Sequence, residues 1–451
     1  MEGMTLEKLA EVIRTPLPEG MPGEQSFSQV AVSPDQLTPG CLYLALDPSQ
    51  RALALEGGAA AVVAAGGGAG CLDADPLEAL TRLATWYRRR FHTWLIGITG
   101  STGKTTVKEM VYHVLERDGR TMKTRWDQND DLGLPLTLLG LEWSHRNAVV
   151  EMGFTHPGSI ARMSRTARPS AGLITCIGSA HLAQCGGPEG LLREKLSITE
   201  GMNASAPLIL NGDDPLLQRA YEFVSQEIIS YGLDNQSADV CGRILSEDLT
   251  GSEMEVRYFG KKQQLHVPLW GRIGCYNTLA AFTVGLVAGM DPAQITQGIA
   301  GFRPVAHRLQ LLHCGEVTVL DDSYTTNPES VREALRLLSL LPARRRIAVL
   351  GDMEDLGEIA ENAHRAVGRR AAQQNIDTLI WVGEYAPIVE EEARRMGGIR
   401  TLTFPDTRSL TTYLQNDRRP GDTVLVKGAR SARLEELIEA VWHPERQEQN
   451  T

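Results

Sequence analysis

The clearest structural signal in this chain is the segment Leu95-Ile-Gly-Ile-Thr-Gly-Ser-Thr-Gly-Lys-Thr-Thr-Val-Lys-Glu-Met110. It reads as a buried strand, a glycine-rich turn and the first turns of a helix, the order in which a phosphate-binding loop is built. Gly100 and Gly103 allow the backbone to curl so that its N–H groups converge on an anion. We therefore expect nucleotide contacts from the whole loop: Gly100, Ser101, Thr102, Gly103, Lys104, Thr105 and Thr106.

Two side chains in this loop suit triphosphate chemistry. Lys104 adds a positive charge for the outer phosphates, and the hydroxyl of Thr105 is a ligand for Mg²⁺. The helix that follows adds the positive end of its dipole. The general pattern G-x-x-x-x-G-K-[ST] requires glycine at position 98, where this chain has Ile98, so the shorter form T-G-x-x-G-K-T applies. A glycine-rich loop without a ligand is the alternative, and the complete order of strand, loop and helix disfavours it.

Length and composition limit the class of protein. A chain of 451 residues is too long for one hydrophobic core and suggests about three domains. Hydrophobic content of 42% and charged content of 22% are ordinary for a water-soluble protein. The net charge of −11 disfavours general nucleic-acid binding, since the phosphate backbone would be repelled. An anionic small-molecule substrate is still compatible with one local positive pocket.

Cysteine usage and hydropathy predict the compartment. The seven cysteines are scattered and include no C-x-x-C pair, which argues against a disulfide framework or a structural zinc site. No apolar run has the length of a membrane span, and the N-terminal residues lack the basic and apolar regions of a signal peptide. We therefore expect a cytoplasmic protein with no membrane span.

Apolar strands alternate with helical stretches along most of the chain, which predicts an α/β fold. We expect a small α/β domain over residues 1–88, a central domain over 89–309 with a phosphate-loop-type parallel sheet, and a Rossmann-like α/β domain over 310–451. No G-x-G-x-x-G follows the first strand of the third domain. The expected strands of the last two domains are 94–99, 148–152, 172–177, 206–210, 317–321, 347–350, 378–382 and 423–426.

Polar residues follow several of these strands, at the sheet edge where α/β proteins bind ligands. Glu151 stands at a strand end facing the phosphate loop, and a carboxylate there suits Mg²⁺ better than a solvated role. His181 and Lys195 occupy a loop and the helix after it. Spacing alone gives these two no function, because a lone histidine is usually structural and a lone helical lysine is usually solvent-exposed.

Three polar segments in the third domain also follow strands: Asp321-Asp-Ser-Tyr324, Gly351-Asp-Met-Glu-Asp-Leu-Gly357 and Lys427-Gly-Ala-Arg-Ser431. Each alone reads equally well as an ordinary turn or helix cap. Three such loops at one edge of a sheet favour a binding edge.

These motifs together resemble the Mur ligase family. The phosphate loop with its Val-Lys-Glu-Met continuation takes part in the resemblance, as do the three polar segments of the third domain. The other matching motifs are Asn129-Asp-Asp-Leu-Gly-Leu-Pro-Leu-Thr-Leu138, Val149-Val-Glu-Met-Gly153 and Ala180-His-Leu182. Each motif is weak alone, and the set in this order is specific. The resemblance covers almost all of the second and third expected domains.

The resemblance implies a role for each matching residue. Lys104 and Thr105 would bind the triphosphate and its Mg²⁺, which Glu151 would share. His181 would hold a second Mg²⁺, and Lys195 falls where the family carries a carbamylated lysine, an anionic oxygen ligand for that metal. Lys104, His181 and Lys195 would be the catalytic residues. Three further positions complete the implied ATP site: Asn277 on the adenine side, and Arg308 and Asp322 from the third domain.

The implied activity is ATP-dependent amide formation through an acyl phosphate, with ADP as product. The first domain would hold a UDP-linked muramoyl tripeptide, the second ATP, and the third the incoming D-alanyl-D-alanine, in peptidoglycan precursor synthesis. These small molecules would be the only partners of a protein that we expect to be monomeric.

Two alternatives stay open from the residues. The first domain lacks the family's usual Asp-Ser-Arg and Asp-Gly-His segments, and has Val32-Ser-Pro-Asp35 and Asp47-Pro-Ser-Gln-Arg-Ala52 in their regions. A related ligase acting on another acid and amine is therefore the second hypothesis. A nucleotide-binding scaffold without catalysis is the third, and it has no use for the residues of a second metal site. A GTPase is disfavoured because no N-K-x-D motif is present.

Overall fold

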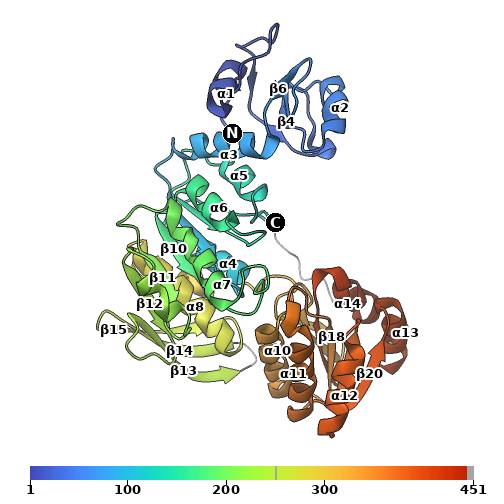
Figure 1. Ribbon diagram of the computed structural model, residues 1–451. Coiled ribbons are helices and arrows are strands. Elements are labelled where there is room, and N and C mark those ends of the chain that lie inside the picture. The colour runs from blue at the N-terminus through green and yellow to red at the C-terminus, as the bar shows by residue number, and fades with distance from the viewer. Residues whose placement is uncertain (249–250, 444–451) are drawn as a thin grey trace.

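The computed structural model describes residues 1–248 and 251–443, and the chain forms three α/β units in succession. In Figure 1 the N-terminal unit lies at the top, the central unit below it and the C-terminal unit at the lower right. The main sheets of these units have four, nine and six strands respectively. The predicted three-domain α/β class is confirmed.

The first unit contains a small parallel sheet and three helices. In spatial order the strands are β3 (Val30–Ala31), β4 (Leu42–Leu44), β5 (Ala61–Ala64) and β6 (Cys71–Asp73). A separate antiparallel pair joins β1 (Met4–Thr5) to β2 (Ser26–Phe27). The helices are α1 (Leu6–Ile13), α2 (Arg51–Glu56) and α3 (Pro76–Arg88). The amphipathic pattern of α1 puts Leu6, Leu9 and Ile13 in the core.

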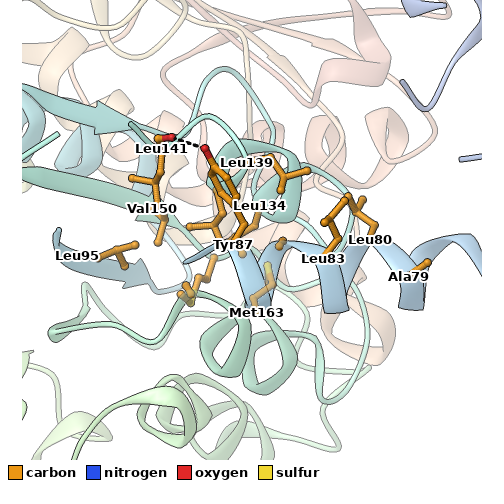
Figure 2. Close-up of a cluster of buried hydrophobic side chains, with 14 of the residues drawn as sticks. Ala79, Leu80, Leu83, Tyr87, Leu95, Leu134, Leu139, Leu141, Val150 and Met163 are labelled. Atoms are coloured by element: carbon orange, nitrogen blue, oxygen red, sulfur yellow. Dashed lines mark hydrogen bonds between the residues drawn. The ribbon is translucent and has the colours of Figure 1, made fainter. Parts of the chain in front are cut away.

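Helix α3 attaches the first unit to the central one. Figure 2 shows Leu80, Leu83 and Tyr87 of α3 packed among apolar side chains of the central unit, such as Leu134 and Met163. The hydroxyl of Tyr87 donates a hydrogen bond of 3.0 Å to the carbonyl of Leu141. These buried contacts form one continuous core across the two units. The division of the chain at residue 88 therefore stays a prediction, because the core does not break there.

The central sheet places the phosphate loop at its middle. In spatial order the strands are β15 (Lys261–Val267), β14 (Gly251–Tyr258), β13 (Val240–Asp248), β12 (Ile228–Gly232), β11 (Leu208–Asn211), β10 (Ala171–Ile174), β7 (Trp94–Thr99), β9 (Asn147–Glu151) and β8 (Thr121–Lys123). The pairs from β8 to β13 are parallel. All residues of β9 and β10 are buried, as expected of strands covered on both faces.

Six helices belong to this central unit: α4 (Lys104–Leu115), α5 (Gly133–Leu138), α6 (Ser159–Ala167), α7 (Pro188–Leu196), α8 (Gly271–Val287) and α9 (Pro292–Ala300). Helices α4, α8 and α9 share one hydrophobic core with the face of the sheet that carries Ile96 and Ile98. This packing fixes the start of α4, and with it the phosphate loop, against α8.

The third unit repeats the α/β plan with a smaller sheet. In spatial order its strands are β16 (Gln310–Cys314), β17 (Val317–Asp322), β21 (Asp422–Lys427), β18 (Arg345–Gly351), β19 (Thr378–Val382) and β20 (Arg400–Phe404). Its helices are α10 (Pro328–Leu340), α11 (Ala360–Gln373), α12 (Ala386–Met396), α13 (Thr407–Asp417) and α14 (Leu434–Trp442). All pairs are parallel except β16 with β17. The last residues of the expected third domain lie outside the described part of the chain.

The structure adds elements that the sequence analysis did not identify. Strands β14 and β15 extend the central sheet by antiparallel pairing with β13, so the sheet is mixed at one edge. The expected strand 172–177 ends at Ile174, since Thr175 turns to bond the phosphate loop. Within residues 1–248 and 251–443, none of the helices combines the length and apolarity needed to cross a membrane.

Candidate active site

The turn between β7 and α4 is tight enough to require its glycines. Gly100 has a φ of +142° and Gly103 a φ of +85°, conformations that glycine adopts without strain. A Cβ atom on Gly100 would lie 2.0 Å from Oγ1 of Thr175. A Cβ atom on Gly103 would lie 2.8 Å from Oδ1 of Asn277. The loop is therefore held between β10 and α8, with Asn277 against the point where α4 begins.

Side chains around the loop hold its backbone in place. The hydroxyl of Thr175 donates to the carbonyl of Thr102 at 2.6 Å, and the N–H of Ser101 donates to the carbonyl of Cys176 at 2.9 Å. The Lys104 ammonium donates to the carbonyl of Gly100 at 2.8 Å, so it folds back over the loop. Burial lowers the pKa of Lys104, and the Glu151 carboxylate opposes this shift. The loop has the geometry and positive charge of an anion site.

Glu151 stands at the end of β9, facing Thr105. Its Oε1 accepts hydrogen bonds from the Thr105 hydroxyl at 3.3 Å and from Nδ2 of Asn129 at 2.8 Å. Its Oε2 is buried and accepts no hydrogen bond within the described residues, and Nζ of Lys108 lies 4.0 Å away. A buried carboxylate oxygen without a donor is costly unless a cation meets it. Glu151 and Thr105 therefore fit a Mg²⁺ ion that takes its other ligands from phosphates and water.

The residues described include no cluster of three or more His, Cys, Asp or Glu side chains that could hold a metal by themselves. This agrees with Mg²⁺, which seldom has a cage made only of protein groups. Any metal at this site would depend on the bound nucleotide for part of its coordination.

His181 and Lys195 lie against the same aromatic ring. The ring of His181 is 5.0 Å from that of Phe154, centroid to centroid, and Nζ of Lys195 is 5.7 Å from the Phe154 centroid. Lys195 is only 1% exposed, so the surface alternative for this lysine is wrong. Burial, and then the charge of Lys104, lower the pKa of Lys195 to about 7. Burial is also the main cause that lowers the pKa of His181, whose Nδ1 lies 3.6 Å from Oδ2 of Asp355.

A cleft of about 1540 Å³ runs from the phosphate loop to the third unit. Asn277, Arg308 and Asp322 line it together with Thr102, Gly103 and Thr106. These six predicted nucleotide residues therefore share one cavity, whereas the other four, Gly100, Ser101, Lys104 and Thr105, are not part of its lining. Its lining continues into apolar residues, among which are Leu269, Trp270, Ile273 and Leu311.

The third unit presents charged pairs to this cleft. Asp322 accepts a hydrogen bond of 2.6 Å from the buried Lys427 ammonium, and its Oδ1 accepts one from the N–H of Leu309. The guanidinium of Arg308 lies 4.3 Å from the ring centroid of Tyr324, a cation–π distance. These contacts hold Arg308 and Asp322 on the wall opposite the phosphate loop.

The polar segments of the third unit divide between two cavities. Asp322 and Lys427 line the large cleft, whereas Asp352, Asp355 and Ser431 line a separate cavity of about 660 Å³. The carboxylate of Asp352 accepts hydrogen bonds from Nε1 of Trp381 and from the N–H of Glu384. Asp352 therefore serves the packing of the sheet edge, and only part of the predicted binding edge meets the nucleotide cleft.

Four residues near the loop escaped the sequence analysis as individual site residues: Lys108, Asn129, Asn327 and Glu329. Nδ2 of Asn327 donates to the Thr102 hydroxyl at 3.0 Å, and Oε2 of Glu329 accepts from the Ser179 hydroxyl at 3.0 Å. The only sequence signal at these two positions was Asn327-Pro328, which is typical of a helix start and does not indicate a contact with the phosphate loop. These two bonds connect the start of α10 directly to the phosphate-loop region.

Comparison with known proteins identifies the family. Residues 98–285 match the Mur ligase middle domain, and residues 307–430 match the Mur ligase glutamate ligase domain. The UDP-N-acetylmuramoyl-tripeptide--D-alanyl-D-alanine ligase of Synechocystis is 32% identical, with 92% of this chain and 86% of the relative aligned. The enzyme of the same name from Escherichia coli is 30% identical over 98% of this chain and 99% of its own length.

Solved structures agree on the fold. A crystal structure of MurF from Acinetobacter baumannii has a TM-score of 0.89 and 24% identity, covering 98% of this chain and 99% of that one. A MurF ligase from Thermotoga maritima, crystallised in complex with ADP, has a TM-score of 0.80 and 24% identity, covering 92% and 97%. With the domain matches and the full-length relatives, these findings establish that the chain is a ligase of the Mur ligase family.

Proposed function

We propose that this chain joins D-alanyl-D-alanine to UDP-N-acetylmuramoyl-tripeptide, with cleavage of ATP to ADP and phosphate, in cytoplasmic peptidoglycan precursor synthesis. The observation that carries the ligase chemistry is the Glu151 carboxylate beside the phosphate loop: its Oε1 accepts a hydrogen bond from Thr105, and its Oε2 accepts none within the described residues. The choice of substrates is supported by the names of relatives that align over most of the chain.

ATP occupies the large cleft in this proposal. Backbone N–H groups of the loop and the Lys104 ammonium bind its phosphates, as in other phosphate loops. Asn277 contacts the nucleotide from α8, and Arg308, at the junction of the two units, and Asp322 of the third unit close the cleft. The apolar lining beyond Asn277 is suited to the adenine base.

The reaction has two steps. A carboxylate of the acid substrate attacks the γ-phosphorus of ATP, which gives an acyl phosphate and ADP. The amine of the acceptor then attacks the acyl carbon, and phosphate leaves. Thr105 and Glu151 would hold Mg²⁺, which when bound supplies positive charge beside the phosphates. Lys104 and the loop N–H groups stabilise the charge that develops during transfer, and the three units position the reactants.

His181 and Lys195 form the proposed second metal site. Nitrogen side chains alone are poor partners for Mg²⁺, which prefers oxygen ligands. A carbamate formed from CO₂ on Lys195 would supply such oxygens. The buried Lys195 makes no ion pair within the described residues, and its lowered pKa favours the neutral amine that reacts with CO₂. The ring of His181 lies near the same Phe154 ring as Lys195 and would supply the nitrogen ligand.

In this proposal each unit binds one of the three substrates. The first, residues 1–88, holds the UDP-linked substrate, the central unit, 89–309, binds ATP, and the third, 310–451, receives the dipeptide. The protein acts as a monomer with these small molecules as its partners. A ligase redirected to another acid and amine is not favoured, because relatives that align with most of this chain at 30–32% identity carry the same enzyme name.

The test is phosphate release from ATP with UDP-N-acetylmuramoyl-tripeptide, measured with and without D-alanyl-D-alanine. Release that requires both substrates is the expected result. ATP binding without release under these conditions would reject the proposed substrates and favour the redirected ligase.

A further inference from the structure

Glu329 is a carboxylate that the third unit presents to the phosphate-loop region. It occupies the first turn of α10, directly after Pro328, and the side-chain amide of Asn327 caps this helix start. Its Oε2 accepts a hydrogen bond of 3.0 Å from the Ser179 hydroxyl of the central unit. The same oxygen lies 3.4 Å from the position that a Cβ atom on Gly178 would take. Glu329 therefore crosses from one unit to the other at the loop after β10.

No cation pairs with this carboxylate in the described part of the chain. Within residues 1–248 and 251–443, Glu329 takes part in no ion pair, and only its Oε2 accepts a hydrogen bond. The neighbouring side chain of Ser101 is 8% exposed, and its hydroxyl also lacks a hydrogen-bond partner there. The half-buried Glu329 carboxylate and the Ser101 side chain are thus both close to Gly178, whose Cβ position is 3.2 Å from Cβ of Ser101.

The position of Glu329 relative to the loop indicates which reactant it meets. Asn277 contacts the loop at Gly103, on the side of the cleft that suits the adenosine. Glu329 meets the other end, near Ser101, where the segment leading to His181 begins. A free carboxylate repels phosphate groups but attracts an ammonium group. A negative charge here suits the reacting amine of the acceptor, which arrives as an ammonium group.

We infer that Glu329 binds the ammonium group of the incoming amine and takes a proton from it, an inference that rests on the proposed function. One N–H bond of the ammonium breaks, and the proton passes to the Glu329 carboxylate. The neutral nitrogen then forms a bond to the acyl carbon, while the bond from that carbon to the phosphate oxygen breaks with its electron pair. The second proton lost by the nitrogen passes to the departing phosphate. Glu329 is thus a catalytic residue of the second step only.

The test measures the two steps of the reaction separately in the variant Glu329→Gln. Glutamine has the shape of glutamate and can still accept the hydrogen bond from the Ser179 hydroxyl, but it lacks the negative charge. With ATP and UDP-N-acetylmuramoyl-tripeptide, trapping of the acyl phosphate by hydroxylamine should equal that of the wild type. Turnover with D-alanyl-D-alanine should fall by about 100-fold or more, the usual contribution of a general base. The KM for the dipeptide should rise, whereas the KM for ATP should not change.

The control is Glu78→Gln, which alters another first-turn glutamate of a helix that begins with proline, in α3, where it is paired with Arg82. It should keep wild-type turnover. Glu329→Asp should retain part of the activity, since it keeps the charge. Wild-type kinetics in Glu329→Gln, or an equal loss of both steps, would overturn the role of Glu329. A wild-type protein that forms no acyl phosphate from these substrates would instead contradict the proposed function.

Discussion

The hydroxyl of Thr105 lies 3.3 Å from Oε1 of Glu151, although 46 residues separate them in the sequence. The parallel pairing of β7 with β9 brings them together, because both strands end at the same edge of the sheet. Among the residues that the structure describes, Oε2 of the same carboxylate accepts no hydrogen bond. This pair places one hard oxygen ligand on the helix start and another on the neighbouring strand, close enough together to bind one metal ion.

Glu151→Gln should abolish Mg²⁺-dependent turnover while ATP binding without Mg²⁺ persists. The glutamine side chain can still accept a hydrogen bond from Nδ2 of Asn129, but it lacks the negative charge that attracts the ion. Titration calorimetry of ATP binding with and without Mg²⁺ measures the difference. Glu116→Gln, at the exposed far end of α4, should behave as wild type. A Mg²⁺ effect on ATP binding that survives in Glu151→Gln would reject the metal role.

Gly103→Ala should lose nucleotide affinity because its Cβ would meet Oδ1 of Asn277 at 2.8 Å. Gly158→Ala is a matched control, since each glycine directly precedes a helix, and the φ is +85° at Gly103 and +87° at Gly158. Among the described residues, no atom lies within 4 Å of the position that a Cβ on Gly158 would take. Both variants should be less stable by about 1 kcal/mol, because alanine, unlike glycine, is strained in the left-handed backbone conformation. Fluorescence titration with an ATP analogue should show weaker binding only in Gly103→Ala, and equal binding in both would contradict the close contact.

The central fold could be predicted because its signals are local. Strand Trp94–Thr99 and the loop after it follow from an apolar run and from glycines with a lysine and a threonine at fixed spacing, and β19 was likewise predicted at its observed bounds. The antiparallel strands β14 and β15 were missed. Their alternating burial, clear in β14, is a weaker signal than the continuous apolar run of a fully buried strand.

The site was predicted only as far as single motifs allow. Thr105 was found through the phosphate-loop motif and Glu151 through its strand end. The burial of Lys195 was not found, since nothing in a helical lysine shows which face the fold covers. Contacts between units, such as Asn327 with Thr102, depend on how two separate sheets pack. No spacing in the sequence encodes a pair 225 residues apart.

Lys104→Ala should remove ATP-dependent turnover and leave the fold intact. The ammonium bonds only the carbonyl of Gly100 among the described residues, so its removal should cost little stability but should take the positive charge from the loop. Turnover is measured by phosphate release, and the fold by circular dichroism. A variant with wild-type turnover would reject the phosphate-loop interpretation.

Lys195→Ala should abolish turnover, and acetate should partly restore it, because a small carboxylate can supply the oxygens that the proposed carbamate provides. The Lys104 variant serves as the control, since its defect is a missing positive charge and acetate should not help. Labelling the wild type with ¹³C-bicarbonate gives an independent readout, a carbamate carbon signal that is absent in Lys195→Ala. Unchanged activity in Lys195→Ala would exclude its role in catalysis.

Asp322→Ala should destabilise the third unit by about 3 kcal/mol or more, because it leaves the Lys427 ammonium buried without its carboxylate. Lys427 is 1% exposed, and its Nζ lies 2.6 Å from Oδ2 of Asp322, with the carbonyl of Thr325 as its other partner. Urea denaturation followed by the fluorescence of Trp381 and Trp442, both in the cores of the third unit, reports the loss. Glu11→Ala removes an exposed pair with Lys8 and should change the stability by less than about 1 kcal/mol. Equal effects of the two variants would show that the buried pair contributes nothing beyond a surface ion pair.

Asp322 also lines the nucleotide cleft. A saturating ATP concentration should therefore raise the free energy of unfolding more in the wild type than in Asp322→Ala.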